Sequence, residues 1–159
     1  MIGDLAGSTA ALWRGFMALS TTPVDARFYD VMRIGDTAGS ADLGAAAILS
    51  GRKTATSALP EDFAADLGPP PIGSFSVVLD GGGAAVCVVR TVALSLCRFD
   101  ALDAGFARDY GEWDGSLETL RRELGAHYGA RAAALGLDWH EEREILCEWF
   151  EVVHRASAD

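Results

Sequence analysis

The sequence is poor in lysine: of its 13 basic side chains, only Lys53 is a lysine and the rest are arginines. Its three cysteines form no closely spaced pair, which argues against a CxxC redox motif or a zinc site. No apolar run reaches membrane-spanning length, and the N-terminal 20 residues lack the basic head of a signal peptide. We therefore expect a cytoplasmic protein with reduced thiols, no metal and no cofactor.

Positive charge is scarce as well, since the formal net charge of the 159 residues is −10. A surface this acidic repels phosphate chains, so long duplex nucleic acid is not an expected partner. A local basic pocket for a small nucleoside-like substrate or a short RNA is still compatible with this charge. The length and the 50% hydrophobic content fit one globular domain.

The apolar pattern predicts alternating helices and strands along the chain. A β-hairpin is the clearest element, because two apolar strands flank the glycine run at 81–83. Isolated helices between distant strands favour an α+β fold, a small mixed β-barrel flanked by helices. The predicted helices cover 8–20, 40–50, 61–67, 101–111 and 116–136, and the predicted strands cover 26–35, 54–60, 74–80, 84–97 and 143–155.

The lone lysine lies in the stretch GRKTATS, residues 51–57. A lysine amine can lose its proton when it is buried, whereas a guanidinium effectively cannot. If the chain bends after the lysine, Lys53 could take a proton from the hydroxyl of Thr56 and make it a nucleophile. The alternative is an ordinary solvated lysine at a helix C-terminus, which composition alone favours.

A second polar cluster, YGEWDGS at 110–116, precedes the helix that Ser116 is expected to cap. Its two carboxylates, Glu112 and Asp114, can simply stabilise the helix N-terminus. Alternatively, Glu112 orients or protonates a substrate and Trp113 offers a stacking surface. Both interpretations stay open at the level of the sequence.

Five stretches of the chain, taken in order, form a recognisable series. They are Gly35-Asp36, GRKTATS at 51–57, VCVVRTV at 86–92, YGEWDGSL at 110–117 and ILCEWFEVV at 145–153. This series resembles the ASCH family of the PUA-like superfamily. Trp113 departs from the family pattern, in which glycine is usual at this position.

The resemblance implies a PUA-like barrel over residues 26–155, with an N-terminal helix in residues 1–25 packed on it. It further implies an amidohydrolase, because a bacterial relative hydrolyses acetylated cytidine with a lysine, a threonine and a glutamate. By motif these are Lys53, Thr56 and Glu112. The residues expected to contact the substrate are Arg52, Thr54, Trp113, Asp114 and Arg121.

Two other functions stay open. The first is an RNA- or nucleotide-binding module, in which Arg52, Lys53 and Arg121 contact phosphate and Trp113 stacks on a base. The second is a ribonuclease. Its only candidate catalytic groups are a pair of histidines, such as His127 and His140.

Overall fold

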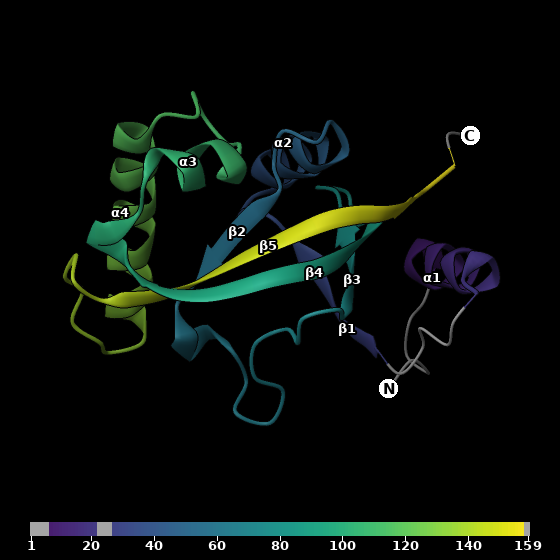
Figure 1. Ribbon diagram of the computed structural model, residues 1–159, viewed down its shortest axis with the longest axis horizontal. Helices are drawn as coiled ribbons and strands as arrows, with labels where there is room; N and C mark the ends of the chain where they lie inside the picture. Colours follow the sequence, from purple (N-terminus) through teal and green to yellow (C-terminus); the bar gives the residue numbers. More distant parts are fainter. Residues whose placement is uncertain (1–6, 22–26, 158–159) are drawn as a thin grey trace. The chain divides into compact units, whose positions relative to one another are not determined.

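The computed structural model describes residues 7–21 and 27–157, and its helices and strands follow the predicted order (Figure 1). Mixed helices and strands confirm the α+β class. The helices are α1 (Gly7–Leu19), α2 (Ala38–Leu49), α3 (Ala104–Tyr110) and α4 (Leu117–Ala134), with short 3₁₀ turns η3 (Pro60–Asp62) and η4 (Phe99–Ala101). The strands are β1 (Phe28–Arg33), β2 (Ala55–Ala58), β3 (Phe75–Leu79), β4 (Ala85–Arg98) and β5 (Glu144–Arg155).

The five strands form one sheet in the order β1-β3-β4-β5-β2. Strands β3 and β4 pair antiparallel, which confirms the predicted hairpin, and β2 pairs antiparallel with β5. Strand β1 is parallel to β3. The sheet begins at β1 and ends at β2 without closing, so the predicted barrel is only a loose description of it.

The chain forms two compact units, and the long strands β4 and β5 contribute residues to both. The first unit comprises Met1–Gly51, Pro70–Val92 and Phe150–Asp159. Its core includes Trp13 and Phe16 of α1, which lie against Phe75 of β3. The predicted division between residues 25 and 26 involves positions outside the described residues.

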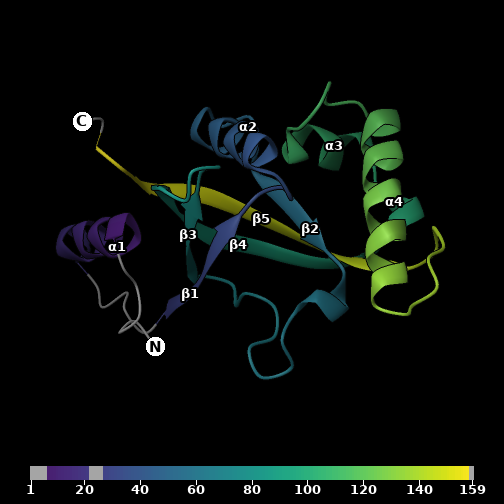
Figure 2. The same cartoon turned by 180° about the vertical axis from the view of Figure 1, so that it is seen from behind.

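The second unit comprises Arg52–Pro69 and Ala93–Trp149. Helices α3 and α4 lie side by side in both views (Figures 1 and 2) and contact each other. One apolar core joins them to β2, β4 and β5, with Phe106, Tyr110 and Tyr128 among its buried aromatic residues. The GRKTATS and YGEWDGS motifs, except Gly51, fall in this unit.

Three predicted helices differ from the observed ones. Helix α3 starts at Ala104 rather than near Ala101, because Asp103 is its N-cap and accepts from the Phe106 N–H. Helix α2 starts at Ala38 rather than near Ser40, because Thr37 and Ser40 form a capping box in which each side chain binds the other's backbone N–H. The helix predicted at 61–67 is only the 3₁₀ turn η3. The backbone is extended at Phe63, with φ of −83° and ψ of 133°, which ends the turn, and the side chains of Glu61 and Asp62 pair with Arg143 and Arg131.

Candidate active site

The backbone before β2 lies against the C-terminal end of α3. The Thr54 N–H donates to the Asp109 carbonyl at 2.7 Å. Gly111 ends α3 in the left-handed conformation, with φ of 65°. A Cβ on Gly111 would lie 2.1 Å from the Arg52 carbonyl oxygen and 2.7 Å from the Lys53 Cα. Only glycine therefore permits both the turn and this close approach.

Lys53 is not the solvated lysine that composition favours, since only 1% of it is exposed. Its ammonium lies 3.5 Å from the centroid of the Tyr110 ring and donates to the Tyr110 carbonyl at 3.1 Å. Glu112 Oε1 lies 2.7 Å from Nζ. At this distance the ammonium and the carboxylate form an ion pair. The fold thus joins one residue from each of the two motifs.

Burial and pairing act on the Lys53 amine in opposite directions. Desolvation disfavours its charged form, while the Glu112 carboxylate favours it. Burial is the larger effect, so the pKa of Lys53 falls from 10.5 to about 8. An amine in this range can release and recover a proton near neutral pH.

This shift predicts a simple NMR result. Because Lys53 is the only lysine, lysine labelled with ¹³C at Cε gives one side-chain resonance. We expect its chemical shift to titrate with a midpoint near pH 8, in contrast to 10.5 for a solvated lysine. The same label in urea-unfolded protein is the control. A midpoint above pH 10 in the folded protein would contradict the buried amine.

Thr56 lies in β2, opposite Glu148 of β5, and is half-buried. Its neighbour in the site is Tyr110. Burial raises the pKa of the Tyr110 hydroxyl well above its ordinary value, and hydrogen bonding from the Ser57 and Thr56 side chains partly offsets this. Tyr110 thus contacts Lys53 through its ring and carbonyl, and its hydroxyl is close enough to Thr56 for that side chain to influence its pKa.

A hollow of about 270 Å³ lies at the Glu112 side of the ion pair, and Glu112 lines it together with Arg52 and Arg108. Lys53 and Thr56 are not lining residues. Trp113 also lines the hollow, 44% exposed, with its ring stacked on that of Tyr110 at 5.8 Å and 6° between planes. Its φ is +50°, a conformation strained for a bulky residue.

Three of the predicted substrate contacts also have structural partners, and one of these three, Asp114, lines the hollow as well. Asp114 accepts from the Ser116 N–H and the Thr119 hydroxyl, which lower its pKa, so it stabilises the start of α4. Arg121 donates to the Asp100 and Leu102 carbonyls, at 2.8 and 2.7 Å. The Thr54 hydroxyl is 3.4 Å from the Asp109 carbonyl.

Sequence reasoning missed three contributors: Tyr110, Arg108 and Gly111. Tyr110 and Gly111 belong to the YGEWDGS cluster, so an aromatic residue and a glycine directly before the glutamate were the available signal. Arg108 carried no signal, because it is one of 12 arginines and its position depends on where α3 ends.

Neither a metal-binding cluster nor a membrane-spanning helix is found in the part of the chain that the structure describes. No three His, Cys, Asp or Glu side chains gather there as a potential metal site. No helix in the same residues has the length and apolar character needed to cross a membrane. Cys87, Cys97 and Cys147 are free thiols, as predicted.

The protein is an α+β domain with one open five-stranded sheet and an ion pair between a buried lysine and a partly exposed glutamate. Comparison with known proteins shows the family to which this domain belongs. The profile of the ASCH domain matches residues 30–154, so the chain belongs to the ASCH domain family. No curated protein sequence matches significantly.

Two solved structures share the fold. An ASCH domain from Lactobacillus crispatus JV V101 has a TM-score of 0.88 at 20% identity, over 96% of this chain and 98% of the other. A protein from Enterococcus faecalis V583 has a TM-score of 0.79 at 21% identity, over 96% of both chains. At these identities the likeness concerns the fold alone.

Proposed function

We propose that this ASCH domain protein is a metal-independent amidohydrolase acting on acylated cytosine nucleosides, such as N(4)-acetylcytidine. The observation that carries the proposal is the buried Lys53 amine, with its pKa lowered to about 8, in contact with Glu112 at the hollow. A solvated lysine remains protonated at neutral pH and is a poor base. The burial of this one supplies the titratable group that amide hydrolysis needs.

In the first step, the Thr56 hydroxyl oxygen forms a bond with the acyl carbonyl carbon while its proton passes to the neutral Lys53 amine. The backbone N–H groups of Arg52 and Lys53 are the candidates to stabilise the oxyanion, because those of Gly51 and Thr54 already donate to the Ile48 and Asp109 carbonyls. The tetrahedral intermediate then breaks its C–N bond, and Lys53 returns the proton to the leaving amine. Water attacks the acyl-threonine ester, releasing the carboxylic acid and restoring the hydroxyl.

Glu112 has two roles in this proposal. Its charge attracts the ammonium that forms during the reaction, and it borders the hollow where the base would lie. Oε1 is buried against the Lys53 ammonium, but the Glu112 side chain is 23% exposed, so its other carboxylate oxygen can accept an N–H from the edge of the base. Trp113 supplies a flat surface for the same ring.

The decisive experiment incubates the purified protein with acylated nucleosides and short RNAs, with and without a chelator. We expect release of cytidine and the free acid at a rate that the chelator does not change. Cleavage of the RNA would select the ribonuclease instead. No turnover of any acylated nucleoside would remove the hydrolase.

Thr56→Ala tests the nucleophile. We expect turnover to fall at least a thousandfold, because the acyl group has no oxygen to form a bond with, while nucleoside binding changes less than threefold. Thr54→Ala is the matched control, since that hydroxyl lies beside a backbone carbonyl. Single-turnover assays and isothermal titration measure the two quantities, and a Thr56→Ala protein with unchanged turnover would exclude the mechanism.

A nucleotide- or RNA-binding role is the second candidate, favoured by the exposed, strained Trp113 beside Arg52 and Arg108. A base can stack on the indole while the guanidinium groups contact phosphate. Affinity that falls steeply with added salt, with no acyl release, would support this role.

Trp113→Gly tests the stacking surface in either role. Glycine adopts positive φ without strain, so the turn is retained while the ring is lost. Stacking contributes about 1–3 kcal/mol per base, so we expect ligand affinity to fall at least tenfold. Trp113→Phe should restore most of it. An unchanged affinity for Trp113→Gly in a fluorescence or calorimetric titration would exclude the stacking role.

A further inference from the structure

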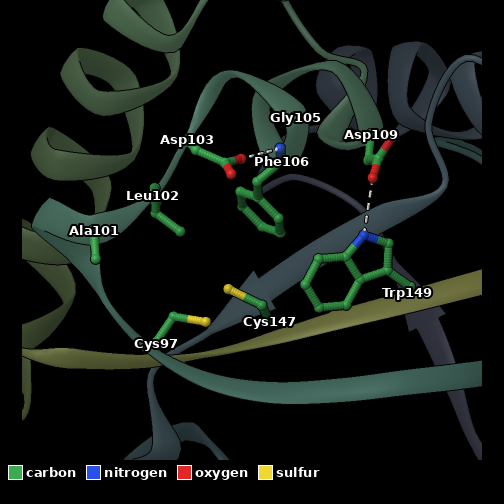
Figure 3. A pocket seen from close by; sticks show the side chains of 9 residues that line it. All are labelled: Cys97, Ala101, Leu102, Asp103, Gly105, Phe106, Asp109, Cys147 and Trp149. Carbon is green, nitrogen blue, oxygen red and sulfur yellow. Dashed lines mark hydrogen bonds between the residues drawn. The ribbon is translucent and has the colours of Figure 1, made fainter.

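A second hollow, of about 320 Å³, lies beside α3 and shares no lining residue with the first (Figure 3). Its lining residues belong to α3 and the turn before it, to β4 and to β5. We propose that this hollow binds a small planar organic cation. The inference is independent of the hydrolysis proposed for the Lys53 site.

Two aromatic rings form one side of this hollow. Phe106 of α3 and Trp149 of β5 meet edge to face, with ring centroids 5.5 Å apart and 75° between planes. Figure 3 shows both rings pointing into the space. A flat ligand can lie against one ring face, and cations bind such faces favourably, tryptophan best of all.

The charged side chains that line the hollow are both acidic. Asp103 accepts from the Phe106 N–H at 2.8 Å, and Asp109 accepts from the Trp149 indole N–H at 3.0 Å. Each bond engages one oxygen of its carboxylate, and the other oxygen can accept an N–H from a ligand. The net charge of −10 adds long-range attraction for cations.

The remaining surroundings limit the ligand. Cys97 and Cys147 face each other across the floor of the hollow in Figure 3, and burial raises the pKa of Cys147, so this thiol stays neutral and adds no charge. The volume is at the lower end for small-molecule sites, which fits one ring with a short substituent. One cation is near the rim: Nη2 of Arg108, which lines the first hollow, would be 3.8 Å from a Cβ placed on Gly105.

Benzamidine, a planar cation, and benzamide, its neutral counterpart, test the proposal. Each hollow has its own tryptophan, so indole N–H resonances report which one is occupied, and Trp149→Phe assigns the signal. We expect benzamidine to shift the Trp149 resonance at a concentration at least tenfold lower than benzamide, without moving that of Trp113.

Two substitutions change the charge in opposite directions. Asp109→Asn keeps an acceptor for the indole N–H but removes the charge. We therefore expect it to lower the affinity for benzamidine about tenfold and to leave the affinity for benzamide unchanged. Arg108→Ala removes a positive charge at an exposed position near this hollow, so it should raise the affinity for benzamidine severalfold. Equal affinities for the two probes, shifts confined to Trp113, or no effect of Arg108→Ala would each overturn the cation site.

Discussion

Lys53→Arg is expected to reduce hydrolysis of an acylated cytosine nucleoside about a thousandfold, although the site keeps its positive charge. A guanidinium does not release its proton at any pH that the folded protein tolerates, so it cannot accept one from Thr56. Loss of a positioned acid–base group lowers rates by about 10²- to 10⁴-fold. Release of the nucleoside, followed by chromatography, measures the effect.

Lys53→Met separates chemistry from packing. In Lys53→Arg, the larger guanidinium must fit where the lysine side chain is fully buried, and such overpacking costs about 1–3 kcal/mol of unfolding free energy. Methionine has a similar length and no charge, so we expect the Lys53→Met protein to remain folded and to lose as much turnover as Lys53→Arg. Activity of Lys53→Arg within tenfold of the wild type would mean that charge alone suffices, and the base would have to be another group.

Much of the fold was predictable because its signals are local. The glycine run at 81–83 marks the β3–β4 hairpin, and Ser116 marks the start of α4, where its side chain accepts from the Thr119 N–H. Errors occurred where side chains compete for the backbone. Thr37 and Ser40 together set the start of α2, which a single candidate cap does not reveal.

The candidate site was predictable only in part. Motif order related Lys53 to Glu112, and the structure places them in contact. The burial of Lys53 was not predictable from composition, because it depends on how closely Gly111 lets the end of α3 approach residues 52 and 53. For Asp114, the local alternative describes its observed hydrogen bonds, since short-range capping needs no tertiary contact.

Glu112→Gln is expected to destabilise the protein in a way that depends strongly on pH. The unfolded lysine has a pKa of 10.5 and the folded one about 8, so the unfolded state binds more protons between these values. Through this group the wild type therefore becomes more stable as pH rises from 8 to 10.5, and the full penalty of the buried ammonium is present below 8. Removing the carboxylate lowers the pKa of Lys53 further.

In Glu112→Gln the buried lysine can still release its proton, and this limits the loss of unfolding free energy. Near pH 9.5 the amine is mostly neutral in both folded proteins, so the variant should differ little from the wild type through this group. Below pH 8 the difference in unfolding free energy should grow by at most about 1.4 kcal/mol per pH unit, until the pH reaches the lowered pKa of the variant. Glu112→Gln at pH 7 should thus lose at most about 1.4 kcal/mol of unfolding free energy through the lysine, less than the roughly 3–5 kcal/mol typical of breaking a buried pair.

Urea unfolding at pH 6, 7, 8 and 9.5 measures this dependence, and the same substitution in a Lys53→Met background is the control. Without an amine to titrate, Glu112→Gln should have an effect that is constant between pH 6 and 9.5. A pH-dependent loss in both backgrounds would assign the titration to another group. A constant loss in both would mean that Lys53 keeps one protonation state over this range, and an amine that does not titrate near neutrality could not exchange a proton with Thr56.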